Sequence, residues 1–387
     1  MYRRGLFALS ADPVHNGHLD IIKKASEQCD TLIIYVTFND QKKGAYLLSV
    51  RARRRLIKAA IGGWLPNTTV ITGDALLTDV FMEQGCDVLI RGIRNKTDLE
   101  YEKGQVAYHD KFLPGISDKT LYLEGDPQFA GISSSLIKSF AFHHIDVSPM
   151  VPLMAKAALE ATLHKQCVIG ITGQMATGKS WVAEKIVEAT SLSGYPAFHL
   201  NFDDLVRELY DEDTPGAQIV RDEIDKLFPG VLIEDGKKVD RAKLKAQIVK
   251  AEQDKLDAVH DLTKPHVFRL YRKHIKGKEG LILVEWAQLI ENGLAPFVNN
   301  RVIIVDSPDL AAMLAKRGVP ADLVARFDRV QWDADKKALA LETEIRAAGY
   351  GRVIRVTNRI GKPLDEMTEL LSQLQGMAPK LDKGVKA

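Results

Sequence analysis

The sequence contains little cysteine, few aromatic residues and no long apolar run. Only Cys29, Cys86 and Cys167 occur among its 387 residues, and their scattered positions exclude a disulfide framework and a cysteine-based metal site. No apolar run approaches the roughly 18 residues of a membrane span, and the apolar part of the N-terminal segment is too short for a secretory signal. We therefore expect a cytoplasmic protein with reduced cysteines and no membrane partner.

An excess of positive or negative charge is also nearly absent. The formal net charge is only +2, so no global field favours nucleic acid. The strongest local charge is RARRR, Arg51–Arg55. We interpret this run as a solvated helix face with one or two anion contacts rather than as a nucleic-acid surface. No nucleic-acid partner is therefore expected.

The length and the alternation of segments predict two domains. A chain of 387 residues with 45% hydrophobic and 27% charged residues is typical of a globular protein of about two domains. Strand-like apolar runs alternate with amphipathic stretches, which predicts parallel sheets with helices on both faces. A helix over 151–166 leads out of the first domain, and the alternation then restarts. We predict an α/β fold with two doubly wound parallel-sheet domains over 1–162 and 166–376, followed by a polar tail over 377–387. The strands are predicted at 5–10, 31–38, 68–73, 87–93, 167–173, 197–202, 281–286, 302–307 and 352–358.

The stretch SADPVHNGHLDII, Ser10–Ile22, combines two histidines with a predicted strand, turn and helix. Such a turn directs backbone N–H groups and the positive end of a helix dipole into one crevice, which suits a phosphate. A single histidine in this turn is more often a capping or packing residue than a catalyst. Here His15 and His18 occur together after Asp-Pro. A second stretch, ISSSLIK at 132–138, places hydroxyls at a helix start, where N-capping and phosphate binding can coexist.

These elements resemble the HxGH nucleotidyltransferase superfamily, which joins a phosphate nucleophile to a nucleoside monophosphate and releases pyrophosphate. Nicotinamide mononucleotide adenylyltransferases share the opening motif, so it does not identify the acceptor. The segment VLIRGIRNKTDLEYE, Val88–Glu102, resembles bacterial phosphopantetheine adenylyltransferases, and FNDQKK at 38–43 and DVSPMVP ending at Pro152 agree with that family.

The resemblance implies a Rossmann-like domain that uses ATP and 4′-phosphopantetheine. His18 would stabilise charge on the α-phosphorus in the transition state, with His15 beside it and Lys42 as a further catalytic residue. The phosphopantetheine contacts would be Ser10, Lys42, Leu77 and Arg91. The ATP contacts would be Ser10, Ala11, His18, Gly92, Ile93, Arg94, Glu102, Phe129, Ile132, Ser133, Ser134 and Ser135.

A different phosphate motif opens the second half. GQMATGKS, Gly173–Ser180, fits G-x-x-x-x-G-K-[ST] after a predicted strand and before a predicted helix. Its amides would wrap the nucleotide phosphates, Lys179 would reach the outer phosphates and Ser180 could bind Mg²⁺. The second strand of this half ends near Asp203 and Asp204. A carboxylate there could hold Mg²⁺ or accept a proton from a hydroxyl, with an acidic helix cap as the alternative.

Together with VREL before Pro215-Gly216 and VTN ending at Asn358, these elements resemble dephospho-CoA kinases over most of 166–376. The resemblance implies Asp203 and Lys179 as catalytic residues, and Ser180 and Asp203 as metal ligands. Arg317, Arg326 and Arg329 fall in a lid-like segment, where they would neutralise the transferred phosphoryl group. The ATP contacts would be Gly173, Ala176, Thr177, Gly178, Lys179, Ser180, Trp181, Arg317, Arg326 and Asn358. The sequence departs from the family pattern at Gln174, Ala176, Trp181, Asn201 and Lys264.

The two implied reactions are consecutive, because the first makes dephospho-CoA and the second phosphorylates it to CoA. The chain thus resembles a bifunctional CoA synthase, with ATP, 4′-phosphopantetheine and dephospho-CoA as its substrates and Mg²⁺ as its cofactor. Two alternatives stay open: a nicotinamide mononucleotide adenylyltransferase fused to another small-molecule kinase, and an active adenylyltransferase fused to a degenerate or retargeted nucleotide-binding domain. Homo-oligomerisation also stays open, because the adenylyltransferase family often assembles into hexamers.

Overall fold

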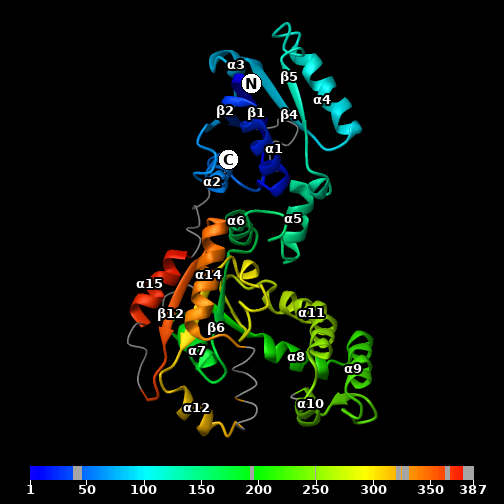
Figure 1. Ribbon diagram of the computed structural model, residues 1–387, viewed down its shortest axis with the longest axis vertical. Helices are drawn as coiled ribbons and strands as arrows, with labels where there is room; N and C mark the ends of the chain where they lie inside the picture. Colours follow the sequence, from blue (N-terminus) through cyan, green and yellow to red (C-terminus); the bar gives the residue numbers. More distant parts are fainter. Residues whose placement is uncertain are drawn as a thin grey trace. The chain divides into compact units, whose positions relative to one another are not determined.

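The computed structural model describes residues 1–37, 46–191, 196–248, 250–319, 324, 331–361 and 367–377. The chain divides into two units, Met1–Leu163 and His164–Ala387 (Figure 1). Each unit contains a five-stranded parallel sheet with helices, which confirms the predicted fold class. Across the described ranges, no helix is both long enough and apolar enough to span a bilayer.

The sheet of the first unit has the strand order β3-β2-β1-β4-β5, so its first strand is central. All four neighbouring pairs are parallel. The strands are β1 (Tyr2–Leu9), β2 (Cys29–Val36), β3 (Thr68–Thr72), β4 (Val88–Ile93) and β5 (Thr120–Glu124). The helices are α1 (Asn16–Ser26), α2 (Val50–Ile61), α3 (Leu77–Glu83), α4 (Lys96–His109), α5 (Ser134–Phe142) and α6 (Leu153–His164), with a short 3₁₀ turn at Pro127–Phe129.

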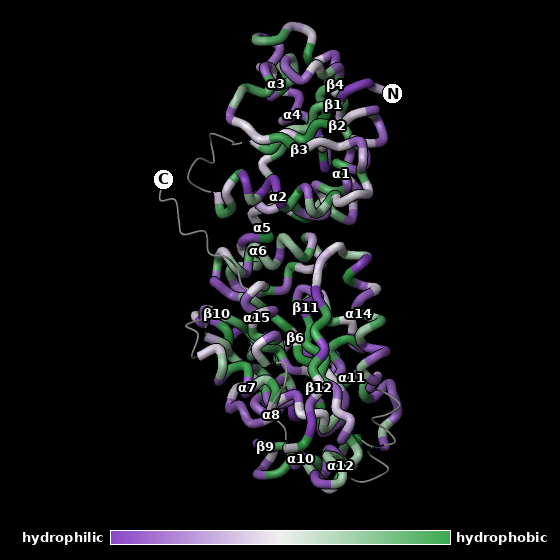
Figure 2. The backbone as a smooth tube through the Cα atoms, turned by 90° about the vertical axis from the view of Figure 1, so that its left-hand side faces the viewer, coloured by the Kyte–Doolittle hydropathy of each residue, from purple (hydrophilic) through white to green (hydrophobic). Residues whose placement is uncertain are grey.

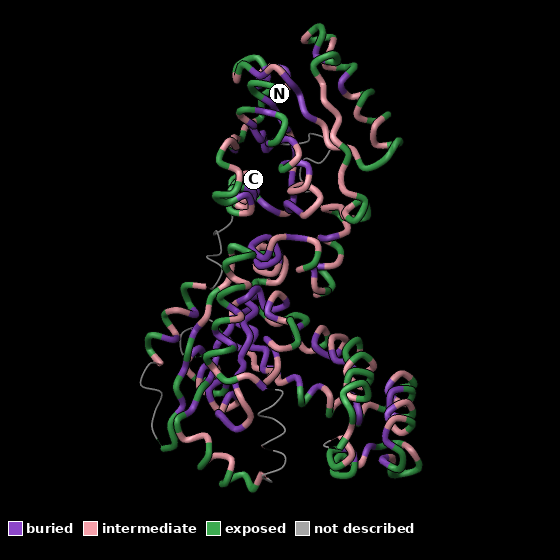
Figure 3. The backbone as a smooth tube through the Cα atoms, viewed as in Figure 1, coloured by how far each residue is buried: buried purple, intermediate pink, exposed green. Residues whose placement is uncertain are grey.

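Alternating side chains of these strands form a core on each face of the sheet. On one face, Phe7, Ile34 and Ile90 pack with apolar residues of α1, α2, α5 and α6. On the other face, Leu6 and Leu89 pack with residues of α3 and α4. Burial on both faces explains why β1, β2 and β4 contain nearly continuous apolar runs. Much of these three strands is drawn as buried in Figure 3.

The basic run in α2 is not a fully solvated face, and that expectation is wrong at Arg53. Arg53 is completely buried, in line with Ile57 and Ile61 on the inner side of the helix. Its guanidinium donates to the carbonyl of Ser10 and, at 3.1 Å, to that of Thr37, and it lies over the ring of Tyr46. Arg51, Arg54 and Arg55 are exposed. The buried arginine therefore binds the carboxyl ends of β1 and β2 together.

The sheet of the second unit has the order β12-β11-β6-β10-β7, again with its first strand central. Its strands are β6 (Gln166–Thr172), β7 (Ala197–Asn201), β10 (Gly280–Glu285), β11 (Arg301–Asp306) and β12 (Arg352–Thr357). The short strands β8 (Leu232–Ile233) and β9 (Lys238–Val239) form an antiparallel pair. The helices are α7 (Lys179–Ser191), α8 (Phe202–Asp211), α9 (Pro215–Leu227), α10 (Arg241–Ile248), α11 (Gln253–Ile275), α12 (Leu310–Lys316), α14 (Ala334–Ala348) and α15 (Met367–Met377), with a 3₁₀ turn at Pro296–Val298.

Two helical layers cover this sheet. Val168, Ile282 and Ile304 belong to one core cluster with apolar residues of α8, α9, α11 and α14. Ile169, Leu283 and their neighbours face α7 and α15. Figure 2 shows the apolar character of β6 and β11 within these layers. Helices α8, α9 and α11 contact one another and lie to one side of the sheet in Figure 1.

Most helices begin at a side-chain cap that is visible in the sequence. Ser49, Asn95 and Asp333 each accept a backbone N–H from the first turn that follows. Thr214 does the same for α9, whose first residue is Pro215. The strands expected from sequence agree with β1 to β4, β6, β7 and β10 to β12 to within three residues at each end. Strand β5 and the β8–β9 pair were not predicted, because β8 and β9 have two residues each and β5 lacks a long apolar run.

We predict that Arg53→Ala lowers the free energy of unfolding of the first unit by about 2–4 kcal/mol, because two buried carbonyls lose their donor and a cavity remains. Arg55→Ala, on the exposed side of the same helix, is the control and is expected to change it by less than about 0.5 kcal/mol. Urea unfolding of the full chain measures both. Equal stability of the two variants would contradict the structural role of Arg53.

Candidate functional site

The first unit has a pocket of about 480 Å³ where β1 and β4 end. These neighbouring strands turn toward different helices, and ligands of open α/β sheets bind at such a point. The expected site residues that line it are Ser10, His15, His18, Arg91, Gly92, Ile93, Arg94, Glu102, Phe129, Ile132, Ser133, Ser134 and Ser135. The structure thus brings together residues from both motifs of the first half.

His15 and His18 lie stacked in the turn that opens α1. Their ring centroids are 3.5 Å apart, and the Nδ1 of His15 accepts the backbone N–H of His18 at 3.3 Å. A Cβ at Gly17 would lie 3.3 Å from the His15 ring and crowd it. Burial, and then the charge of Arg94, lowers the pKa of His15 to about 4, so this ring is neutral at neutral pH. His15 therefore caps the helix as a neutral acceptor, and His18 lines the pocket beside it.

Paired charges form the opposite wall. The guanidinium of Arg91 donates to the carboxylate of Glu102, and Arg94 contacts Asp98 at 2.9 Å. The hydrogen bond from Arg94, partly offset by burial, lowers the pKa of Asp98. Both arginines come from the end of β4 and its following turn, and both acids come from α4. Two fixed cations thus face a pocket that also receives the N-terminus of α5.

Two expected residues of this half do not line the pocket. Ala11 is completely buried in the core beside Val14, and Leu77 begins α3 and packs with Val80 and Phe81; neither lines the pocket. Lys42 lies outside the described residues, as does the segment 38–43.

The phosphate motif of the second unit forms the turn between β6 and α7. Gly173 and Gly178 have φ values of +150° and +90°, and a Cβ at either would lie within 2.2 Å of Val305 or Asn358. The side chain of Asn358 donates to the carbonyl of Thr177 at 2.9 Å, and Gln331 accepts the N–H of Met175 at 2.7 Å. The loop is therefore held by two side chains that lie more than 150 residues later in the sequence.

A buried cluster of charges lies next to this loop. Lys179 is buried, its Nζ donates to the carbonyl of Gln174 at 2.9 Å, and Glu285 ends the neighbouring strand β10. Burial lowers the pKa of Lys179 to about 8, although Glu285 and Asp203 act in the opposite direction. Desolvation raises the pKa of Asp203 even though its side chain is exposed; Lys179 lowers it and Glu285 adds to the rise.

The residues present fit Mg²⁺. The hydroxyl of Ser180 donates to Oε1 of Glu285 at 3.0 Å, and Asp203 interacts electrostatically with the same cluster. Hydroxyl and carboxylate oxygens are hard ligands of the kind Mg²⁺ binds, usually together with waters and substrate phosphates. No group of three or more His, Cys, Asp or Glu residues suited to a metal occurs within the described ranges.

The remaining expected residues of the second half differ in placement. Trp181 is partly buried and packs against the core cluster that contains Val182. Arg317 ends α12, is exposed, and lowers the pKa of Lys179 through its charge. Arg326 and Arg329 lie outside the described residues, as does the tail from 378 onward.

A small pocket of about 70 Å³ adjoins Asp203 and is lined mostly by aromatic and apolar side chains. His260 and Trp286 stack there with centroids 5.8 Å apart. Lys264, the departure from the family pattern, also lines it. Asp203 enters this pocket from α8, whereas His260 and Lys264 enter from α11.

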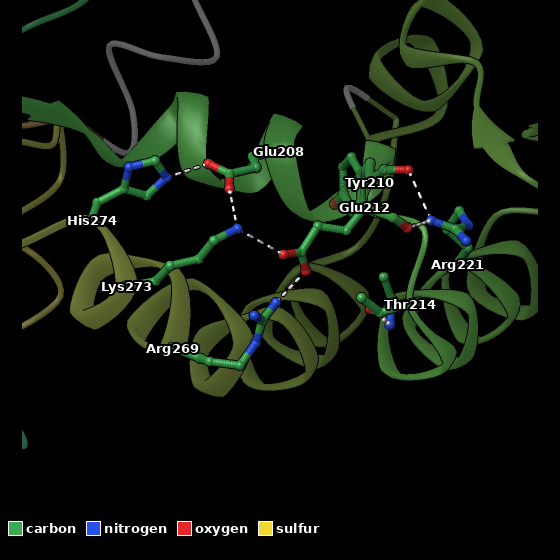
Figure 4. A network of polar contacts seen from close by, with 9 residues as sticks. Glu208, Tyr210, Glu212, Thr214, Arg221, Arg269, Lys273 and His274 are labelled. Atoms are coloured by element: carbon green, nitrogen blue, oxygen red, sulfur yellow. Dashed lines mark hydrogen bonds and ion pairs between the residues drawn. The ribbon is translucent and has the colours of Figure 1, made fainter. Parts of the chain in front are cut away.

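Ion pairs at the far end of α8 hold it against α11 (Figure 4). Glu208 contacts His274 and, at 3.3 Å, Lys273; Glu212 contacts Arg269 and Lys273. Burial alone would raise the pKa of Glu208, but hydrogen bonds from His274 and Lys273 lower it. Arg221, which is buried in α9, donates to the carbonyls of Tyr210 and Glu212. The helix that carries Asp203 is therefore anchored at its carboxyl end.

Comparison with known proteins identifies both halves. A phosphopantetheine adenylyltransferase of Levilactobacillus brevis is 40% identical over 158 residues, which span 41% of this chain and 95% of the relative. The chain belongs to the phosphopantetheine adenylyltransferase family. A family model described as cytidylyltransferase-like matches residues 7–140, and one described as dephospho-CoA kinase matches residues 167–345. The chain therefore carries a phosphopantetheine adenylyltransferase unit followed by a dephospho-CoA kinase domain, and the two resemblances expected from sequence are confirmed.

Two further similarities differ in how much of the chain they cover. The phosphopantetheine adenylyltransferase of Nautilia profundicola is 39% identical over 152 residues, spanning 39% of this chain and 96% of the relative. A solved structure of NadR protein in complex with NAD and AMP-PNP covers 97% of both chains, at 12% identity and a TM-score of 0.33. A score this low carries no argument about function.

Sequence reasoning missed Glu285, which lies beside the phosphate loop, and the buried Asp12 of the first unit. Glu285 ends an apolar strand beside the phosphate loop, and an acid after LILV was the available signal. Asp12 is buried and accepts the N–H groups of Leu47 and Leu48 and, at 3.0 Å, the ammonium of Lys138. Its position beside Pro13 gave no hint of these distant partners.

We predict that Ala176 is held in a conformation that glycine adopts more easily. Its φ is +68°, which costs about 1 kcal/mol for a residue with a Cβ. Ala176→Gly is therefore expected to leave the kinase KM for ATP within threefold and the Tm unchanged or higher. Ala176→Val adds β-branching at the same φ and is expected to lower Tm and raise that KM about tenfold. Calorimetry and steady-state kinetics measure both, and a harmful Ala176→Gly would contradict the predicted conformation.

Proposed function

We propose that the chain catalyses the last two steps of coenzyme A biosynthesis. The first unit transfers the adenylyl group of ATP to 4′-phosphopantetheine, and the second phosphorylates the ribose 3′-hydroxyl of the dephospho-CoA formed. The observation that carries the proposal is the presence, in one chain, of an HxGH pocket and a phosphate loop with an adjacent carboxylate, in families whose reactions are consecutive.

In the adenylyl step, an oxygen of the pantetheine phosphate attacks the α-phosphorus of ATP, and pyrophosphate leaves with the electron pair of the broken bond. The phosphate is already ionised at neutral pH, so no protein base is required. We assign His18, Arg91, Arg94 and the N-termini of α1 and α5 to binding and to stabilising the developing charge. Neutral His15 fixes the turn that presents His18. Positioning and electrostatics supply the catalysis.

In the kinase step, the 3′-hydroxyl transfers its proton to Asp203 and attacks the γ-phosphorus, and ADP leaves. We place the acceptor in the pocket that Asp203 lines and the ATP phosphates on the loop Gly173–Ser180. Lys179 approaches the transferred group from the buried side of the loop. Bound at Ser180 and Glu285, Mg²⁺ would neutralise charge on the phosphates.

A single assay tests the proposal. The purified chain is incubated with 4′-phosphopantetheine, ATP and Mg²⁺, and mass spectrometry separates dephospho-CoA from CoA. CoA is the expected product. Dephospho-CoA alone would leave the first step standing and contradict the second, which would support the degenerate or retargeted kinase domain. Absence of both products would contradict the proposal as a whole.

We predict that variants separate the two steps. His18→Ala is expected to slow pyrophosphate release about 10²–10³-fold, because a donor to transition-state charge is lost, while supplied dephospho-CoA is still converted to CoA. Asp203→Asn is expected to slow CoA formation about 10²–10⁴-fold and let dephospho-CoA accumulate. Each variant is the other's folding control. Full kinase activity in Asp203→Asn would contradict the assignment of the base.

We predict that kcat/KM for ATP in the kinase step depends on pH with a bell-shaped profile. Lys179 must be charged to bind phosphate, so kcat/KM for ATP is expected to fall above about pH 8, the pKa to which burial lowers it. Asp203 must be ionised, and its raised pKa moves the acid limb above the pH at which an ordinary aspartate titrates. Lys179→Arg keeps its charge and should remove the alkaline limb. A flat profile to pH 10 would contradict this prediction.

A further inference from the structure

His199 lies in an unusual position for a histidine, on a sheet face lined mainly by apolar side chains. Strands β7 and β10 are neighbours, with Leu283 opposite His199 and Glu285 opposite Asn201. Residues two apart on a strand share a face, so His199 and Glu285 point to the same side. That side is covered by α7, and its other residues include Ala197 and Leu281. A polar side chain placed there needs a partner.

The partner is the carboxylate beside the phosphate loop. Glu285 is 4% exposed and has a donor on each oxygen: the hydroxyl of Ser180 lies 3.0 Å from Oε1, and Nε2 of His199 lies 2.8 Å from Oε2. Because an ionised carboxylate only accepts, Nε2 carries the hydrogen of this bond. The two donors therefore fix both oxygens of Glu285 and the plane of the carboxylate.

We propose that His199 is a positioning residue of the kinase step, which holds Glu285 so that Oε1 faces the Ser180 hydroxyl and the Mg²⁺ expected there. The inference rests on the proposed kinase function. A group that hydrogen-bonds a metal-binding side chain, without touching the metal, orients that side chain. Removing such a group typically lowers metal affinity about 10–100-fold. Neither Asp203 nor Lys179 supplies this bond to Oε2, which comes from His199.

The charge of Lys179 explains why the orientation matters. Glu285 makes the largest favourable electrostatic contribution to the charged form of this buried lysine. A Glu285 carboxylate without its donor on Oε2 would be free to turn toward that ammonium. The turn would remove Oε1 from Ser180 and place a competing anion near the group that should bind phosphate. By holding Glu285, His199 leaves Glu285 available to bind Mg²⁺ and Lys179 available to bind phosphate.

Three substitutions test the proposal. His199→Leu removes the donor, His199→Gln replaces it with an amide nitrogen of similar reach, and His199→Asn presents the same amide one methylene shorter. The readouts are the Mg²⁺ concentration for half-maximal CoA formation from supplied dephospho-CoA, and Mn²⁺ binding followed by EPR in the presence of a non-hydrolysable ATP analogue. Ser180→Ala removes a proposed metal-binding residue of the second unit. The Mn²⁺ signal that remains in this variant is therefore assigned to nucleotide bound in the first unit.

We expect His199→Leu and His199→Asn to raise both the half-maximal Mg²⁺ concentration and the Mn²⁺ dissociation constant about tenfold or more, with the KM for dephospho-CoA within twofold. His199→Gln should return both values to within threefold of the unsubstituted chain. Phe198→Leu is the control, because Phe198 is the preceding residue of β7, points to the other face and packs under Lys278. It should leave the metal dependence unchanged.

Unaltered metal dependence in His199→Leu would overturn the proposal, as would equal losses in the Leu, Asn and Gln variants, which indicate a packing role. If His199→Leu does not fold, the Gln and Asn variants still decide between these results. A chain that makes no CoA from dephospho-CoA contradicts the kinase function itself, and the Mn²⁺ titration then tests His199 separately.

Discussion

Both sites depend on the central position of the first strand in each sheet. Strand β1 lies between β2 and β4, and β6 lies between β10 and β11, so the chain leaves each central strand toward one side and later returns to the other. The carboxyl edge then has a point where neighbouring connections diverge, and backbone amides and helix N-termini meet there. His15 and His18 occupy this point in one unit, and the phosphate loop occupies it in the other. The same constraint on chain path thus serves two unrelated phosphate motifs.

Much of the fold could be predicted from sequence because the strands are buried on both faces. Such strands read as short apolar runs, and their order along the chain fixes a parallel sheet once helices alternate with them. The motifs were also visible, since the turn after a central strand requires glycine at particular positions, as at Gly173 and Gly178. Strand β5 escaped notice because all of its side chains are at least partly accessible, which leaves no apolar run to detect.

The residues that sequence reasoning missed are mostly buried polar groups. Arg53, Asp12 and Glu285 lie in segments where their charge suggests exposure, and each is stabilised by partners from distant parts of the chain. A buried charged group is tolerated only when its hydrogen-bonding capacity is largely met. Its partners depend on the tertiary fold, so no local pattern reports them. Once the structure is known, such residues are informative, because each shows which distant segments are held together by a buried charged side chain.

The contact between Asn358 and the carbonyl of Thr177 has a consequence for how the protein is made. The first unit ends at Leu163, so all of its residues are synthesised before those of the second unit. The phosphate loop is different, because one of its supports belongs to the last strand of its sheet. At ~5–20 residues per second, the roughly 190 residues up to Asn358 take about 10–40 s to synthesise. During that interval the adenylyltransferase unit is already complete in sequence, whereas the phosphate loop of the kinase unit still lacks the support of Asn358.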